Sequence, residues 1–545
     1  MMDRTARLPP ETLTHIFHSV RRLSRIPPLG ETFWNRRASN SESLYFLGWL
    51  VVTHVCARWR TFALSDATLW VDIPLALGQQ WTSAFLSRSK QAPISVDWSF
   101  AELRPFDSKY EERFFDLLMA HYPRMRELDV RYAETVPFIQ NGAWPTLETA
   151  RLIFSEGHHT TLDLFNGHAP LLRSLSLHTR LQLHQFNWAS PILHNLNSLD
   201  IQFDWAVDAQ SMPSFLDALS GMPRLRDLRL VDWSVRGESP PISPCMACST
   251  SRTVTAALET FVCKTTLNTM CHAMNHIICP PTVRFLLDLG PYYAEDIDQL
   301  AELVPILCPL LSNWYQALPR PNPFVAACIL VEPECARLSA SRSLHNMDGM
   351  GATSSWVSDI HNIEADLNLA LPMDLADWAS PMVDIVRSLM PSTLRVLTFD
   401  FGSEYLLDEL RLSDTLFKGV EVLRLRDATA LPEIHRHFPK LSVLEVQEPQ
   451  LRNIVYRWDD ITGVLNGRGD LRPIRFLYLH VAEEVESVRR GEISRTSCNA
   501  LPPRISQDEI KSVIDEMEAV PEIRVVTENE GIDYEAILEC CREAQ

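Results

Sequence analysis

The chain has 545 residues, of which 46% are hydrophobic and 22% are charged, and its formal net charge is −19. This composition is typical of a folded protein, and the length is too great for one simple core, so we expect a repeat array or several domains. An acidic surface repels phosphate backbones, which argues against general nucleic-acid binding.

The first predicted helix follows Pro9 and Pro10. Proline fits the first turn of a helix because an N–H group in that turn has no intrahelical partner. Four apolar residues then recur at helical spacing and share one face of the helix: Leu13, Ile16, Phe17 and Val20. We therefore expect an amphipathic helix that packs on a neighbouring element.

A second helix is predicted from the same spacing in Val51, Val55, Trp59 and Phe62. Leu69 and Trp70 follow a polar break at Ser65 and Asp66, and can fold back onto that helix. Residues 21–45 are rich in Arg, Ser, Asn and Pro and are interpreted as an inserted surface loop, which a helix pair tolerates at small entropic cost. The pairs Arg21–Arg22 and Arg36–Arg37 are either solvated charges or a nuclear import signal.

The two apolar segments resemble the two halves of an F-box. The first is Leu8-Pro9-Pro10-Glu11-Thr12-Leu13-Thr14-His15-Ile16-Phe17, and the second is Val55-Cys56-Ala57-Arg58-Trp59 followed by Leu69-Trp70. Together with Phe85–Ser89 and Ala92–Ile94, they are most similar to the F-box proteins of mushroom-forming fungi. The inserted loop departs from the compact form of the family, and it could weaken docking.

The resemblance implies an all-helical module over residues 1–72 that binds a Skp-type adaptor and, through it, a cullin ubiquitin ligase. It also implies which residues form the core and adaptor surface of the module, although the sequence does not separate the two sets: Leu8, Pro9, Leu13, Ile16, Phe17, Val55, Cys56, Trp59, Leu69 and Trp70. The alternative is an amphipathic helical hairpin that packs on the next domain.

After a predicted helical linker over residues 73–120, a short pattern of proline and alternating apolar residues recurs. It is clearest at Pro123–Val130, Pro170–Leu177, Pro223–Leu230 and Pro439–Val446. Related copies lie at 147–152, 196–201, 258–263, 283–289, 394–399, 420–425 and 474–479. A period of about 20 to 30 residues with Leu-x-x-Leu-x-Leu is typical of leucine-rich repeats.

Each copy predicts a short strand with one buried face, and the proline ends the helix before it. One such unit cannot bury both of its faces, so neighbouring units are expected to stack. The fold class predicted for residues 121–545 is therefore α/β, an irregular leucine-rich-repeat-like solenoid with a parallel sheet. A doubly wound domain is the alternative, but it does not explain the repeated motif.

Residues 290–390 are the least regular part of the array. Residues 297–307 predict an amphipathic helix, and residues 324–331 and 363–371 predict strands. The polar segments 237–251 and 332–355 predict loops that could carry recognition. At the C-terminal end, a capping-box spacing from Ser506 to Glu509 predicts a helix, followed by a strand at 523–526 and a last helix at 534–542.

No catalytic motif stands out in the sequence, and we expect no enzymatic activity and no cofactor. Cys245-x-x-Cys248 has a spacing that suits zinc, with Cys263, Cys271, His272, His276 and Cys279 downstream. The pair lies in a Pro/Ser-rich segment and Cys263 falls on a predicted buried face. Ordinary thiols are therefore the favoured interpretation, and no metal site is predicted.

The leading functional hypothesis is a substrate receptor of a Skp–cullin–F-box ubiquitin ligase that presents an unknown protein substrate on its repeats. The alternative is a leucine-rich-repeat scaffold without a role in ubiquitin transfer. No apolar run is long enough for a membrane helix, the N-terminus lacks a signal peptide, and the twelve cysteines are scattered. A cytoplasmic or nuclear location is therefore expected, with neither membrane nor nucleic acid as a partner.

Overall fold

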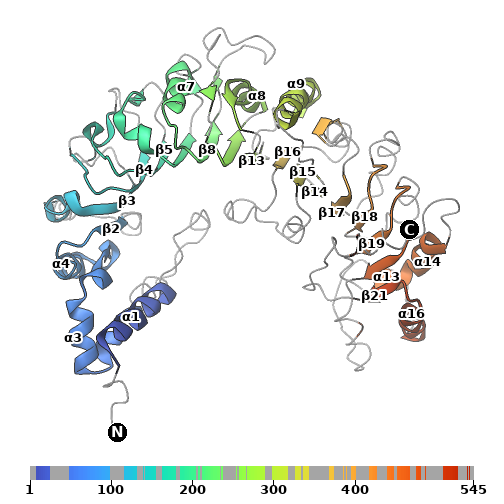
Figure 1. Ribbon diagram of the computed structural model, residues 1–545, viewed down its shortest axis with the longest axis horizontal. Helices are drawn as coiled ribbons and strands as arrows, with labels where there is room; N and C mark the ends of the chain where they lie inside the picture. The colour runs from blue at the N-terminus through green and yellow to red at the C-terminus, as the bar shows by residue number, and fades with distance from the viewer. Residues whose placement is uncertain are drawn as a thin grey trace. The chain divides into compact units, whose positions relative to one another are not determined.

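The structure is a computed structural model of the chain (Figure 1). It describes residues 8–24, 48–97, 116–131, 139, 142–154, 162–179, 185–203, 207–208, 212–233, 235–236, 253–254, 257–265, 267–280, 282–288, 297–316, 324, 326–332, 335–342, 367–372, 384–385, 388–389, 394–400, 417–425, 438–446, 451–466, 474–479, 485, 507–525, 537 and 539.

The chain divides into two compact units. Unit 1 comprises Met1–Thr265, His272–Pro280 and Ser354–His361. Unit 2 comprises Thr266–Cys271, Pro281–Thr353 and Asn362–Gln545. Both units combine helices with a mainly parallel sheet, so the predicted α/β class with parallel strands is confirmed.

Unit 1 begins with helices. The first is α1 (Pro10–Ser24), and after it come the 3-10 helix η3 (Gly48–His54), α3 (Ala57–Ser65) and the 3-10 helix η4 (Ala67–Trp70). Helix α1 packs against the other three. Because α1 continues through Ser24, the predicted loop does not begin at Arg21; residues 25–45 of that loop lie outside the described residues.

The sheet of unit 1 starts directly after these helices. Its strands are β1 (Asp72–Ile73), β2 (Ile94–Asp97), β3 (Met125–Arg131), β4 (Thr149–Phe154), β5 (Ser174–Thr179), β6 (Ser198–Phe203), β8 (Asp227–Trp233) and β11 (Thr260–Thr265). They pair in this order, and every pair is parallel. Two-residue strands form separate pairs, β7 (Val207–Asp208) with β9 (Val235–Arg236) and β10 (Thr253–Val254) with β12 (Ile277–Ile278).

The segment 73–120 holds more than the predicted helical linker. It contains η5 (Leu75–Leu77) and α4 (Gln79–Arg88), but also β2 and the end of β1, which open the sheet. These strands have two and four residues, too few for alternation to reveal them in the sequence. The helical module and the repeats are therefore joined through shared sheet hydrogen bonds.

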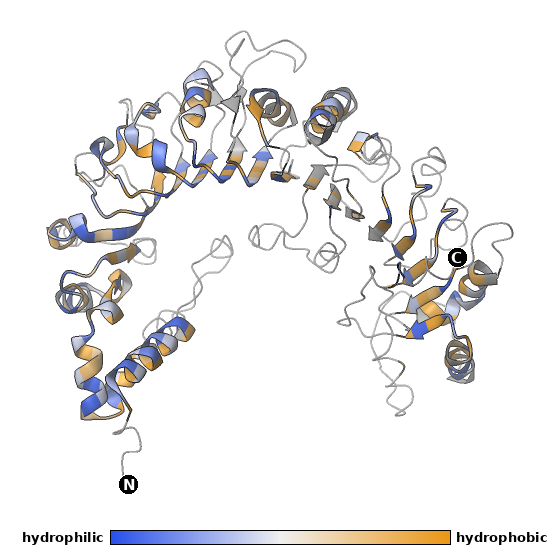
Figure 2. Cartoon of the chain, in the orientation of Figure 1, coloured by the Kyte–Doolittle hydropathy of each residue, from blue (hydrophilic) through white to orange (hydrophobic). Residues whose placement is uncertain are grey.

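Alternation along the strands explains the core of unit 1. Leu175 and Leu177 of β5 are buried and pair in register with Leu199 and Ile201 of β6, so the buried residues form continuous rows across the sheet. Figure 2 shows hydrophobic and hydrophilic residues alternating along these strands. The strands predicted from the repeated motif are all observed. Helices α7 (Met212–Ser220) and α8 (Leu267–His276) are among the elements that connect strands.

Unit 2 carries the strands β13 (Arg284–Asp288), β14 (Ala326–Glu332), β15 (Cys335–Ser341), β16 (Leu367–Pro372), β17 (Val396–Asp400), β18 (Val422–Leu425), β19 (Val443–Val446), β20 (Phe476–Leu479) and β21 (Ile523–Val525). The pairing order is β13, β16, β15, β14, β17, β18, β19, β20 and β21. Its helices are α9 (Ile297–Gln316), α13 (Leu451–Tyr456), α14 (Trp458–Asn466) and α16 (Gln507–Ala519).

Strand β15 corrects the prediction of a loop over residues 332–355 in its first part, Cys335–Ser341, whereas residues 343–355 lie outside the described residues. It runs antiparallel to both β14 and β16, so these three strands form a meander that inverts the chain order within the sheet. The alternating small residues of Cys335–Ser341 carry a weak strand signal in the sequence, because most of them are neither β-branched nor aromatic.

The predicted helix at 534–542 lies almost entirely outside the described residues.

Arg124 fastens the end of α4 to the start of β3. Its guanidinium donates to Ser89 Oγ at 3.0 Å, to the Ala92 carbonyl at 2.8 Å and to the Leu86 carbonyl at 3.1 Å. Burial lowers the pKa of this guanidinium, although the group stays charged at neutral pH. One side chain thus satisfies three acceptors on the segment that leads into β2.

No helix of the part of the chain that the structure describes is long and apolar enough to cross a membrane.

Replacing Arg124 with alanine should lower the free energy of unfolding by about 2–4 kcal/mol, because three part-buried acceptors lose a charged donor. Arg224→Ala is the matched control: Arg224 follows Pro223 as Arg124 follows Pro123, but its side chain is exposed. Urea unfolding followed by circular dichroism measures both changes. Equal stability of the two variants would contradict the structural role of Arg124.

Candidate partner-binding surface on the N-terminal helices

An aromatic cluster forms the core between the helices and the start of the sheet. Trp70 lies at its centre, with its ring 4.8 Å from Phe85 of α4 and 5.1 Å from Trp49 of η3, both edge-on. Its indole Nε1–H donates to the carbonyl of Ala63 at 2.8 Å, and the guanidinium of Arg88 lies 4.2 Å from its ring centroid. The polar atom of Trp70 is therefore satisfied, and η4 is fixed onto α3 and α4.

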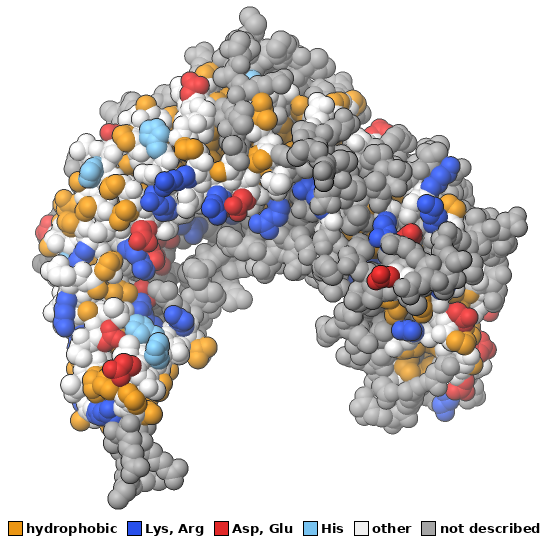
Figure 3. All heavy atoms as spheres, viewed as in Figure 1, with side chains coloured by type: hydrophobic (Ala, Val, Ile, Leu, Met, Phe, Trp, Pro, Cys, Tyr) orange, Lys and Arg blue, Asp and Glu red, His pale blue; other side chains and the backbone are white. Residues whose placement is uncertain are grey.

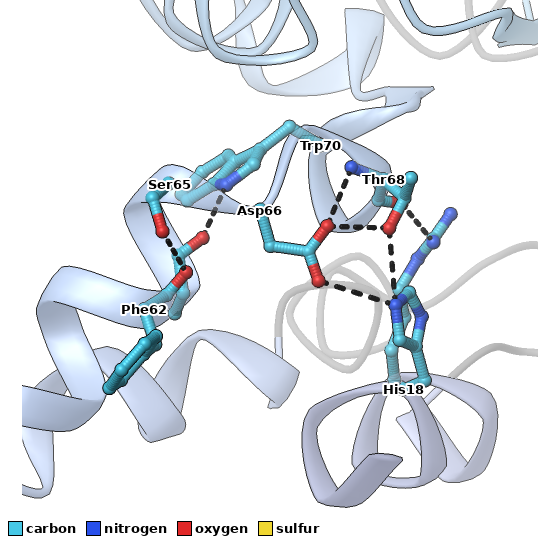
Figure 4. A network of polar contacts seen from close by, with 8 residues as sticks. His18, Phe62, Ser65, Asp66, Thr68 and Trp70 are labelled. Carbon is cyan, nitrogen blue, oxygen red and sulfur yellow. Dashed lines mark hydrogen bonds and ion pairs between the residues drawn. The ribbon is translucent and has the colours of Figure 1, made fainter. Parts of the chain in front are cut away.

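A polar network joins α1 to η4 (Figure 4). Asp66 caps η4 by accepting from the backbone N–H of Thr68 at 3.0 Å and from its hydroxyl at 2.6 Å. His18 Nε2 of α1 lies 3.1 Å from the Thr68 hydroxyl oxygen and 3.4 Å from Asp66 Oδ2. The single hydroxyl proton of Thr68 is used on Asp66, so Nε2 of His18 must carry the proton and donate.

Arg21 strengthens the same junction one turn further along α1. Its guanidinium donates to the Thr68 carbonyl at 2.7 Å and forms an ion pair with Asp72 of β1. The Arg21 side chain is only 11% exposed. The interpretation of Arg21–Arg22 as an accessible nuclear import signal is therefore wrong for Arg21, because its charge is used inside the protein; Arg36–Arg37 lies outside the described residues.

The structure sorts the predicted site residues into core and surface. The residues fully buried in the module are Leu13, Phe17, Leu69 and Trp70. The half-buried ones are Leu8, Ile16, Cys56 and Trp59, with the Trp59 ring 5.2 Å from Phe17. Pro9 and Val55 are exposed. Only the half-buried and exposed residues can contact a partner.

The second predicted helix is wrong in its continuity. The segment forms η3 and α3, and the break lies at Cys56, whose extended backbone and Sγ cap α3 by accepting from the Trp59 N–H at 3.5 Å. The break rotates Val51 and Val55 out of the core, and they are 59% and 52% exposed. Periodicity alone misses it because a cysteine cap is an unusual helix signal.

An apolar surface results at the end of the module where α1 begins. Leu8 and Pro9 lie directly before α1, and Arg58 of α3 donates from Nη2 to the Leu8 carbonyl. Val55 comes directly before the capping residue of α3, and Val51 lies one turn earlier in η3. Figure 3 shows hydrophobic side chains on the surface at this end of the N-terminal helices. We call Leu8, Pro9, Val51 and Val55 the terminal apolar surface.

The sheet of unit 1 supplies a second surface, which is polar. One row of neighbouring residues crosses five strands and is half-buried throughout: Asp129, Arg151, Ser176, Asp200 and Arg229. The Ser176 hydroxyl donates to Asp200 Oδ2 at 3.1 Å, and Arg229 Nε lies 3.7 Å from Asp200 Oδ1. Burial raises the pKa of the Asp200 carboxyl, against the Ser176 hydrogen bond and the charges of Arg151 and His178.

The matching row in unit 2 is buried instead. It contains Thr398, Arg424, Glu445 and Tyr478, which are adjacent across β17 to β20. Arg424 Nε lies 3.0 Å from Glu445 Oε2, so the two buried charges compensate each other. Among the described strands, a polar row that a partner could reach is therefore found in unit 1.

Among the downstream residues of the zinc alternative, Cys263 and Cys271 can be described, while the side chain of His272 lies outside the described residues. Cys263 and Cys271 are buried in β11 and α8, and burial, with a smaller effect from Cys308, raises the pKa of the Cys271 thiol to about 12. A thiol with such a pKa stays protonated at neutral pH, which disfavours metal binding. No group of potential ligands gathers within the described ranges; Cys245, Cys248 and the predicted loop at 237–251 lie outside them.

Phe17→Ala should destabilise the module by about 3–5 kcal/mol, because it removes a buried ring beside Trp59. Val55→Ala should change the free energy of unfolding by no more than about 0.5 kcal/mol, because that side chain is largely in water. Urea unfolding monitored by tryptophan fluorescence tests both. A large loss of stability for Val55→Ala would place this residue in the core and remove it from the surface.

Asp66→Ala should cost about 1–2 kcal/mol of stability, because η4 loses its cap and His18 loses the carboxylate that lies 3.4 Å from its Nε2. Asp66→Asn should cost less, since its side-chain oxygen can still accept from the Thr68 N–H. Thermal unfolding compares these variants with Asp217→Ala, which removes an exposed carboxylate from α7. If Asp66→Ala is as stable as this control, the Asp66 cap does not stabilise the module.

Comparisons with known protein families and with curated proteins find no match to this chain.

Proposed function

We propose that the chain is a substrate-receptor subunit of a Skp–cullin–F-box ubiquitin ligase. The N-terminal helices would dock on the adaptor, and the repeats would hold the protein to be modified. The observation that carries the proposal is the terminal apolar surface: Pro9 and Val55, from the two segments that resemble an F-box, are exposed on a module whose core is already filled.

Apolar side chains that gather on one exposed surface beside a well-packed core are typical of a protein-binding surface, whereas single exposed ones are common on any protein. Leu13, Phe17 and Trp70 fill the interior, so Pro9, Val51 and Val55 are not needed for packing and remain available to a partner. Burying them against an adaptor would remove apolar area from water, at about 25 cal/mol for each Å². Leu8 and Trp59 are half-buried, so each keeps some apolar area that a partner could cover.

We further propose that the strand units are leucine-rich-repeat-like and form a solenoid. The parallel strands of unit 1 pair in chain order, as expected when each unit stacks on the previous one. The meander β14–β15–β16 makes unit 2 irregular. The half-buried polar row of unit 1 is the surface that we assign to the substrate protein.

A receptor of this kind needs no catalytic residue. Tethering raises the effective concentration of a substrate lysine near the thioester of the conjugating enzyme, and this proximity accelerates transfer. The chain would act in the cytoplasm or the nucleus, where such ligases work. Without adaptor binding, the same architecture would serve as an interaction scaffold.

Titration calorimetry with a purified Skp-type adaptor tests the proposal. The unaltered chain should bind, and Leu8→Ala combined with Pro9→Ala should weaken binding at least tenfold. Val55→Glu should abolish binding, because it places a charge in the centre of an apolar contact.

Leu171→Glu is the control, because Leu171 is an exposed leucine of unit 1 outside the module, 43% accessible to solvent. It should bind the adaptor like the unaltered chain, and circular dichroism should show all variants folded. A folded, unaltered chain that does not bind any Skp-type adaptor would remove the ligase function and leave the scaffold.

A further inference from the structure

The Leu8 carbonyl lies just before α1, on the terminal apolar surface. Pro9 and Pro10 have no backbone N–H, so this stretch carries backbone acceptors without the matching donors. The Pro9 carbonyl accepts from the Leu13 N–H at 3.2 Å, which begins the helix. The Leu8 carbonyl is satisfied by a side chain from another helix.

That side chain is Arg58, in the first turn of α3. Its Nη2 donates to the Leu8 carbonyl, across 50 positions of the chain, and its guanidinium carbon lies 5.5 Å from the ring centroid of Phe62. The ring restrains the planar guanidinium, so the donor is already oriented toward Leu8. The charged donor makes this hydrogen bond stronger than a neutral one.

We propose that Arg58 is a positioning residue for adaptor docking: it holds Leu8 and Pro9 at the N-terminal end of α3 so that the terminal apolar surface exists before the adaptor binds. This inference rests on the proposed function. A segment that is already ordered loses less conformational freedom on binding, which raises affinity without a direct contact between Arg58 and the partner.

Arg173 offers a matched control outside the module. Its Nη1 also donates to a backbone carbonyl distant in the chain, that of Asn195, at 3.3 Å. Arg58→Ala should weaken adaptor binding about tenfold in titration calorimetry, whereas Arg173→Ala should stay within about twofold. Arg58→Lys should give an intermediate affinity, because lysine keeps a charged donor but lacks the planar fork.

Hydrogen exchange measured by mass spectrometry separates positioning from folding. Arg58→Ala should speed exchange at the Leu13 amide, which donates to the Pro9 carbonyl at the start of α1, and leave α4 unchanged. Faster exchange throughout the module would mean that Arg58 holds the fold, and the positioning role would be overturned.

The binding result distinguishes this inference from the proposed function. If the unaltered chain binds and Arg58→Ala binds equally well, the positioning role fails while the function stands. If the unaltered chain does not bind, the function fails and the docking role of Arg58 fails with it. In that case the exchange measurement still decides whether Arg58 orders Leu8 and Pro9.

Discussion

The contact of Trp70 with Ala63, Phe85 and Trp49 is the interaction on which the N-terminal half of the structure depends. It joins three helical elements to the strand that begins at Asp72, two residues later. Burial of the ring supplies the driving force, and the indole N–H sets the orientation. Because Arg124 then ties α4 to β3, the helices and the first repeats share one continuous core.

That core also decides which residues remain for partners. Leu13 and Phe17 turn inward, the Cys56 cap interrupts the following helix, and Val51 and Val55 are left in water. The sheet of unit 1 is divided in the same way between core and surface: apolar residues are buried on one face, and a row of mostly charged residues lies on the other. In unit 2 both faces are buried between β17 and β20, and the charges there compensate each other. The two units therefore present different chemistry from the same kind of strand.

The proposed function combines these features. An apolar surface on a helical module with a filled core suits docking on a partner protein. A polar row of mixed charge suits selective recognition, because unpaired or mispaired charges penalise the wrong protein. Direct fusion of the helices to the sheet would hold the substrate at a defined place relative to the ligase, which effective concentration requires.

The sequence by itself determined the α/β class, the strands of the repeated motif, and helices such as α1, α9 and α16, because each rests on a local period of apolar residues. It also located the two segments of the candidate surface. Only the tertiary structure decided that Leu13, Phe17, Leu69 and Trp70 are core while Pro9 and Val55 are surface, since a helical face does not reveal what covers it. The contact of Arg58 with Leu8 joins residues 50 positions apart, so no local pattern encodes it. Strand β15 depends on its pairing with β14 and β16, and the break at Cys56 depends on a cysteine cap, which is an unusual helix signal.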